Sequence, residues 1–150
     1  MLMIDWPEFN TEGDLPVGVY RAGLSDVLEY FGTDTPQHRI MGRRLARIFE
    51  LARSTGHLSR FIIFGSFVTS KSAPNDVDIF LLMDDSFEVD QLSGAANVVF
   101  RQSTAQNWLG ASIFWLRRFA AIGGEESAIE DWQHKRDGSR RGIVEVTSDD

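Results

Sequence analysis

Two short, strongly apolar runs limit the folds that this chain can adopt. The sequence RFIIF at residues 60–64 is followed at once by Gly65, and IFLLM at residues 79–83 follows two closely spaced aspartates. Runs of this length, rich in β-branched and aromatic residues and bounded by turn residues, predict strands that are buried on both faces of a sheet. The segment between them is rich in Ser, Pro, Asn and Asp, which predicts a turn. The 150 residues allow one domain with a core of ordinary size.

A long helix is predicted before the first strand. Thr35 followed by Pro36 is typical of a helix start, because the threonine caps free N–H groups and the proline fits the first turn, and Gly56 supplies a stop. Between them, apolar residues recur at helical spacing at Ile40, Met41, Leu45, Ile48, Phe49 and Ala52. We place the main domain at residues 35–150. Residues 1–34, with scattered Pro and Gly, are interpreted as an irregular N-terminal arm that contains a short helix at LSDVLEYF.

The later part of the chain has weaker patterns. We expect a third strand at NVVF (residues 97–100) and a short helix at STAQNWLG (residues 103–110). The apolar segment ASIFWLRRFA (residues 111–120) is compatible with a strand or a helix, and we favour the helix. Asp137-Gly138 is a strong turn signal and predicts a C-terminal β-hairpin. The predicted fold class is therefore α/β (α+β), a small mixed β-sheet with helices and this hairpin.

The composition limits the cellular locations and the kinds of binding partner that we expect for the protein. The formal net charge is −7 and the pI is near 4.9, which disfavours broad DNA binding because such binding depends on a basic surface. No apolar run approaches the roughly 20 residues that span a bilayer, so we expect no membrane insertion. The absence of cysteine excludes thiol nucleophiles and cysteine-ligated metals, and it fits a cytoplasmic location.

Asp76 and Asp78 stand at the start of the second predicted strand. Side chains at positions i and i+2 of a strand share one face, with Cα atoms roughly 6.5–7 Å apart, so two ionised carboxylates placed in this way repel each other. Unless they are protonated or paired with arginines, a bound cation explains the pair best, and oxygen ligands favour Mg²⁺ or Mn²⁺ over zinc. The alternative is structural, with Asp76 in the turn and Asp78 in a salt bridge at the sheet edge.

Gly65 and Ser66 complement this pair. A glycine at a strand end lets a ligand approach the backbone, and the N–H groups that follow it can form a nest for an anion, to which the serine hydroxyl adds a donor. Lys71 is interpreted either as a phosphate contact or as a solvated turn residue. An anion cradle facing a paired-carboxylate metal site suits a nucleoside triphosphate with its magnesium ion.

The arrangement Gly65-Ser66, nine residues, Asp76-Val77-Asp78 resembles the signature of the polymerase-beta-like nucleotidyltransferase superfamily. The longer GSFVTSKSAPNDVDI is most similar to small stand-alone bacterial members, including minimal nucleotidyltransferases of toxin–antitoxin pairs. The resemblance implies a mixed sheet with helices mainly on one face, and two metal ions held by the aspartates. It also implies phosphates held by Gly65 and Ser66, and transfer of a nucleoside monophosphate to a hydroxyl of a protein or an RNA.

Active members of this superfamily carry a third carboxylate on a later strand. Glu145 in GIVEV is the only acidic residue set inside a later apolar strand, and we assign it this catalytic role. The strand predicted at NVVFRQ offers Arg101 instead of an acid. If Glu145 lies outside the pocket, the alternative is a weakly active or inactive nucleotidyltransferase fold that acts as an antitoxin or a regulatory binding module with a toxin partner.

Several other side chains leave two interpretations open. Trp108, Trp115 and Trp132 are suited to base stacking or to core packing. The cations around the Asp137-Gly138 turn either steer a triphosphate or an RNA acceptor, or form a solvated tip; they are Lys135, Arg136, Arg140 and Arg141. The three histidines do not share the spacing of metal ligands.

Overall fold

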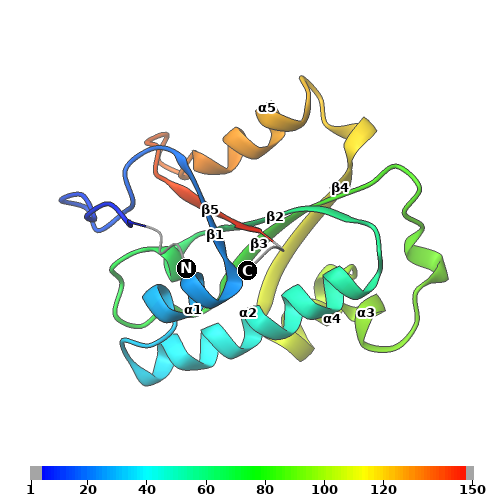
Figure 1. Cartoon of the computed structure of the whole chain (residues 1–150), viewed down its shortest axis with the longest axis horizontal. Coiled ribbons are helices and arrows are strands. Elements are labelled where there is room, and N and C mark those ends of the chain that lie inside the picture. The colour runs from blue at the N-terminus through cyan, green and yellow to red at the C-terminus, as the bar shows by residue number, and fades with distance from the viewer. Residues whose placement is uncertain (1–4, 148–150) are drawn as a thin grey trace.

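The computed structural model describes residues 5–147, and a five-stranded mixed sheet lies at its centre (Figure 1). The strands lie in the order β1-β5-β2-β3-β4. β2 is antiparallel to both of its neighbours, whereas β1 pairs with β5, and β3 with β4, in parallel. The bounds are β1 Val19–Gly23, β2 Leu58–Phe64, β3 Val77–Met83, β4 Ala111–Arg117 and β5 Ile143–Thr147. The predicted fold class, a small mixed α/β sheet, is confirmed.

Most of the helices cover one face of this sheet (Figure 1). They are α1 Leu24–Phe31, α2 Pro36–Ser54, α3 Gly94–Val99 and α4 Gln102–Leu109. α5 Glu125–Glu130 lies on the opposite face. Strand alternation separates the two cores, since Phe61 and Ile63 pack with the larger helical layer while Ile62 packs with Ile129 of α5. Burial on both faces explains the apolar runs at residues 61–64 of β2 and 79–83 of β3.

The longest helix forms as its sequence predicts. The Thr35 side chain accepts a hydrogen bond from the His38 backbone N–H at 3.2 Å, and Pro36 occupies the first turn. The predicted apolar positions are confirmed as buried at Met41, Leu45, Ile48, Phe49 and Ala52, with Ile40 packed at the edge of the core. None of the helices in the described part of the chain is long and apolar enough to cross a membrane.

Two of the later predictions are wrong. NVVF belongs largely to helix α3, and the segment that we favoured as a helix is strand β4 followed by a short 3-10 turn. The parallel partner β3 decides this ambiguity, because it pairs with β4 over its whole length. Ile113 then faces the helical layer, whereas Phe114 and Leu116 face the α5 side and remain partly exposed.

Both ends of the described chain differ from the predictions in one respect each. Residues 19–31 are not irregular, because β1 joins the sheet and α1, the short helix expected at LSDVLEYF, follows it directly. The predicted C-terminal hairpin is reduced to a single bridge between His134 and Arg140 around the Asp137-Gly138 turn. β5 pairs instead with β1 and β2.

Candidate active site

The end of β2 and the start of β3 meet at one edge of the sheet. Their antiparallel register places Phe64 opposite Asp78, so Gly65 follows directly beside the Asp78 carboxylate. Gly65 has φ of +80°, a conformation that L side chains rarely adopt, and a Cβ added there would overlap the carboxylate of Asp78. The glycine is therefore required both by its backbone angle and by the space that Asp78 occupies.

A pocket of about 850 Å³ opens at this sheet edge. We call it the strand-end pocket. Five of the six predicted site residues line it, namely Gly65, Ser66, Lys71, Asp76 and Asp78. The glycine-serine turn forms one side and the two aspartates another. The structure thus brings together the two halves of the motif that the sequence singled out.

The two aspartates have no cation partner in the described residues: no ion pair within 4.0 Å forms at either carboxylate between residues 5 and 147. Burial raises the pKa of Asp78, and the neighbouring charge of Asp76 raises it further, while Arg141 and Arg136 partly oppose the shift. An uncompensated, half-buried carboxylate of this kind gains from a bound cation. The two carboxylates offer only oxygen ligands and lie beside the glycine-serine turn. Such ligands would suit Mg²⁺ or Mn²⁺.

The pair does not form a complete metal cage. Within residues 5–147 no group of three or more His, Asp or Glu side chains is arranged to hold a metal ion. A cation at Asp76 and Asp78 would take its remaining ligands from water and from phosphate oxygens, which is how Mg²⁺ is usually bound with nucleotides.

The third wall of the pocket comes from residues 134–141, which we call the cation loop. Lys135, Arg136 and Arg141 of this loop line the pocket. The buried carboxylate of Asp14 holds two of them, at 2.8 Å from Lys135 Nζ and 3.5 Å from Arg141 Nη1. These contacts fix two cations beside the space where an anion would bind.

Asp14 also connects the cation loop to the glycine-serine side. The chain around it pairs with the segment that leads to Lys71, through an isolated bridge between Asp14 and Thr69 and a hydrogen bond of 2.8 Å from the Ser70 N–H to the Gly13 carbonyl. Sequence reasoning missed Asp14 because nothing local marks it; the two cations that its carboxylate binds lie 121 residues or more along the chain.

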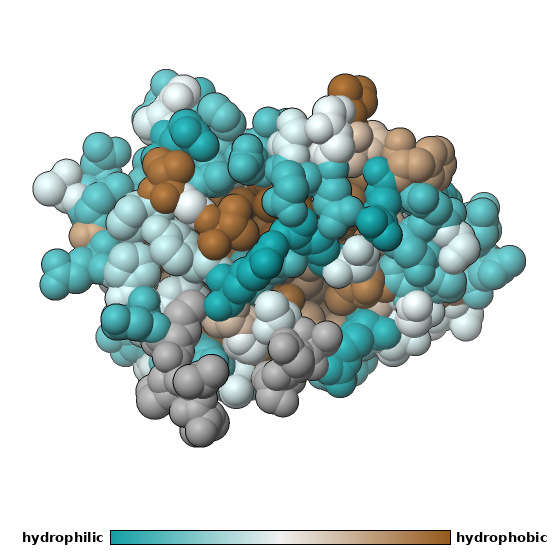
Figure 2. Space-filling view, turned by 45° about the horizontal axis from the view of Figure 1, so that its top comes forward, coloured by the Kyte–Doolittle hydropathy of each residue, from teal (hydrophilic) through white to brown (hydrophobic). Residues whose placement is uncertain are grey.

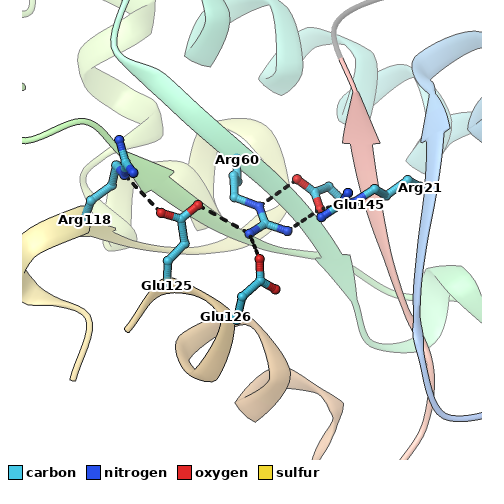
Figure 3. A network of polar contacts seen from close by, with 6 residues as sticks. All are labelled: Arg21, Arg60, Arg118, Glu125, Glu126 and Glu145. Carbon is cyan, nitrogen blue, oxygen red and sulfur yellow. Dashed lines mark hydrogen bonds and ion pairs between the residues drawn. The ribbon is translucent and has the colours of Figure 1, made fainter. Parts of the chain in front are cut away.

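Glu145, which we predicted to be the third catalytic carboxylate, lies apart from the other predicted site residues. It does not line the strand-end pocket. Arg60 donates to both of its carboxylate oxygens at 2.8 and 2.7 Å, and Arg21 donates at 3.1 Å (Figure 3). Burial would raise the pKa of Glu145, but the hydrogen bonds and charges of Arg60 and Arg21 lower it below its usual value. β5 places this glutamate on the far side of β2 from Asp78 of β3.

The same arginine ties α5 to the sheet (Figure 3). Arg60 Nη1 donates to Glu126 at 2.6 Å and to Glu125 at 3.3 Å, and Arg118 donates to Glu125 at 3.0 Å. The network that contains Glu145 therefore joins β1, β5, β2 and α5, which is a structural role.

Ser112 lies beside Asp78 on the neighbouring strand β4. It is the register partner of Asp78 on β4, and it lines the pocket. Asp137 lines the opposite wall, but its carboxylate accepts from the N–H and the hydroxyl of Ser139 at 2.9 and 2.6 Å, and these bonds lower its pKa. Asp137 thus caps its own turn.

Aromatic rings form the floor between the two sides of the pocket. Trp132 stacks on Phe64 with ring centroids 4.5 Å apart and lies 5.2 Å from Phe114; all three line the pocket. The other two tryptophans considered for stacking lie outside it, since Trp108 is 78% exposed on α4 and Trp115 packs against the core. Of the three tryptophans, Trp132 is the one that lines the strand-end pocket.

The fold and the pocket define a small mixed α/β protein with a two-carboxylate site at one edge of its sheet. Residues 7–147 match the model of the family of unknown function DUF6932, and the chain belongs to this family. No curated protein and no solved structure matches the chain significantly.

Proposed function

We propose that the protein is a metal-dependent nucleotidyltransferase that transfers a nucleoside monophosphate from a nucleoside triphosphate to a hydroxyl of a protein or RNA acceptor. One observation carries the proposal: Gly65-Ser66 and the Asp76/Asp78 pair converge in one pocket, whose third wall carries Lys135, Arg136 and Arg141. A metal-bound triphosphate carries a positive metal ion and negative phosphates. The carboxylate pair suits the metal ion, and the cations in the same pocket suit the phosphates.

The reaction forms a bond between the acceptor oxygen and the α-phosphorus and breaks the bond from that phosphorus to the β-phosphate oxygen. Pyrophosphate leaves with the bonding electrons, and the hydroxyl proton passes to water. Mg²⁺ or Mn²⁺ held by Asp76 and Asp78 would supply charge neutralisation at the phosphate oxygens. The backbone N–H groups after Gly65 and the Ser66 hydroxyl bind the leaving phosphates, and Lys71 and Arg136 supply further positive charge.

The aromatic floor suits the base of the nucleotide. Trp132 and Phe114 present rings to the pocket opposite the aspartates, and stacking accepts any base because every base has a π face. The setting that we propose is the cytoplasm, where nucleoside triphosphates and magnesium are available, in the context of a toxin–antitoxin pair.

A second function is favoured by Ser112 and Glu145 together. The position beside Asp78 on β4 carries a hydroxyl, and the only acid of the later strand is held by two arginines away from the pocket. Without a third carboxylate to activate the acceptor, the protein would bind a nucleotide with little turnover and act as an antitoxin or regulatory module.

Label transfer tests both functions. Each of the four α-labelled ribonucleoside triphosphates is incubated with cell lysate, Mg²⁺ or Mn²⁺, and wild-type protein, the Asp76→Asn/Asp78→Asn variant or the control Asp90→Asn, which changes an exposed acid outside the pocket. Metal-dependent label that disappears only in the double variant supports the transferase. Nucleotide-dependent stabilisation without label supports the binding module, and the absence of both contradicts the two proposals.

A further inference from the structure

Apolar side chains gather on the α5 side of the molecule, close to the strand-end pocket. Phe114 and Leu116 of β4 are 38% and 37% exposed, and Phe119 and Ile122 of the segment that follows are 73% and 93% exposed. We call these four residues the β4 patch. In Figure 2 hydrophobic atoms gather at the upper right, where Figure 1 places the segment that joins β4 to α5. Contiguous exposed apolar residues on a small protein mark an interaction surface.

A second pocket, of about 450 Å³, lies at the base of this patch. We call it the side pocket. Leu116 and Ile122 line it together with Phe80 of the sheet. Phe114 and Trp132 line both the side pocket and the strand-end pocket, so these two rings form the wall between them. A chain bound in the side pocket therefore lies next to the two-carboxylate site.

The backbone beside the patch is also open to pairing. Among the described strands, β4 lies at an edge of the sheet and pairs with β3 alone. An edge strand presents unpaired N–H and C=O groups, and extended peptides commonly bind by adding a strand at such an edge while alternate side chains enter pockets. Phe114 and Leu116 alternate on the face that carries the side pocket.

The charges around the side pocket select the kind of chain. Asp131 lines this pocket and Glu130 precedes it, both are exposed, and neither forms an ion pair within residues 5–147. Unpaired carboxylates repel an RNA backbone and attract lysine or arginine. The cations of the cation loop line the strand-end pocket instead. The cations that we propose for phosphate binding and the carboxylates that we propose for acceptor binding thus lie on opposite sides of Phe114 and Trp132.

We propose that the β4 patch docks an extended, basic segment of a protein, with an apolar side chain in the side pocket, and that the acceptor of the transfer is therefore a protein and not an RNA. The inference rests on the proposed function for the identity of the acceptor. The docking surface itself rests on the patch, the edge strand and the unpaired carboxylates.

A random 12-residue peptide library displayed on phage tests the docking surface. The full chain is the target, and the Leu116→Asp/Ile122→Asp variant is used for counter-selection. Val17→Asp is the matched control, because Val17 is 49% exposed and precedes β1 at the opposite edge of the sheet. Enriched peptides are synthesised, and their Kd is measured by fluorescence anisotropy in parallel with a random 12-nucleotide RNA pool.

We expect peptides that carry apolar residues with lysine or arginine, that bind wild type and Val17→Asp alike, and that bind the double variant at least about tenfold more weakly. Labelling of such a peptide bearing a serine or tyrosine supports its role as acceptor. Equal binding to the double variant, acidic peptides, or RNA binding that the double variant loses would each overturn the proposal.

Nucleotide binding is measured separately, because Leu116 and Ile122 do not line the strand-end pocket. The Leu116→Asp/Ile122→Asp variant is expected to bind Mg²⁺ and ATP as wild type does. Peptide binding by a protein that does not bind nucleotide would contradict the proposed function and leave the docking surface supported.

Discussion

The backbone of Gly65 lies against the carboxylate of Asp78, so that position 65 has no room for a Cβ. This contact joins the two halves of the motif, since the glycine-serine side and the carboxylate side of the strand-end pocket touch at these residues. Any change that moves one of them moves the other.

Gly65→Ala is expected to abolish nucleotide binding. Gly56→Ala is the matched control, because Gly56 has a similar φ of +75° but open space around its Cβ position. Backbone strain alone costs about 1 kcal/mol in the free energy of unfolding, whereas Gly65→Ala adds the collision with Asp78. Urea unfolding and nucleotide titration of both variants check this, and equal effects of the two substitutions would contradict it.

Asp78→Asn is expected to stabilise the metal-free protein at neutral pH. Because the folded state raises the pKa of Asp78, the stability associated with its protonated form is fully present below the ordinary aspartate pKa of 3.8 and is lost as the pH rises through the higher folded pKa. The variant is therefore more stable than wild type at pH 7.5 in EDTA, and the difference shrinks towards pH 3. Added Mg²⁺ should raise the Tm of wild type only. A Tm difference that does not change with pH would count against this account.

Glu145→Gln tests the structural role of the Arg60 network. The substitution removes the charge that accepts two hydrogen bonds from Arg60, a side chain that is 9% exposed, while Arg60 keeps its ion pairs with Glu125 and Glu126, so we expect a loss of about 2 kcal/mol in the free energy of unfolding. Glu126→Gln, at a partner that is 68% exposed, should cost less than about 1 kcal/mol.

The pH dependence of the Glu145 contribution has the opposite sign to that of Asp78. Its pKa is lowered in the folded state, so its stabilisation is present above the ordinary glutamate pKa of 4.5 and is lost as the pH falls through the folded pKa. Label transfer by Glu145→Gln at temperatures where it is folded should match wild type. A selective loss of turnover would restore the catalytic role.

The Asp14→Asn variant tests whether Asp14 acts by holding Lys135 and Arg141 in place or only through its own negative charge. If the Asp14 charge only weakened the positive potential of the strand-end pocket, its removal would tighten nucleotide binding. We expect the reverse, a Kd about tenfold higher, because Lys135 and Arg141 lose the ion pairs that hold them beside the pocket. Isothermal titration with ATP and Mg²⁺ decides the sign, and Glu12→Gln, an exposed acid two residues earlier, is the control.

Ser112→Asp is expected to raise the rate of label transfer. The substitution places a third carboxylate next to Asp78 on β4, where it can accept the acceptor proton, and general bases contribute about 10²-fold or more. Ser112→Asn fills similar space without a charge and should leave the rate unchanged. If both variants behave alike, the missing carboxylate does not limit the reaction.

The sequence predicted the strand-end pocket better than it predicted the edges of the fold. Gly65, Ser66, Asp76 and Asp78 were predictable because they lie at or next to the facing ends of β2 and β3, which are consecutive along the chain and adjacent in the sheet, so local pattern and tertiary position agree. Strand β4 was not predictable, because its seven residues are compatible with the periodicity of a strand and with that of a helix. The hydrogen bonds to β3 decide in favour of the strand.

Glu145 shows the opposite limit. Its local pattern, an acid inside an apolar strand, is the same for a catalytic group and for a buried ion pair. The distinction depends on Arg60, 85 residues earlier, and on Arg21, 124 residues earlier. Long-range pairing of this kind leaves no signal in a single sequence.

The last strand of the chain has a consequence for how the protein is made. β5 lies between β1 and β2, and among the described strands it is the only partner of β1. Residues 142 and 143 donate hydrogen bonds to the carbonyls of Leu15 and Gly18, next to the segment that carries Asp14. During synthesis, β1 and the Asp14 segment therefore form these contacts only after residues more than 120 positions later have left the ribosome. A nascent chain that lacks residues 135–147 cannot form the complete strand-end pocket.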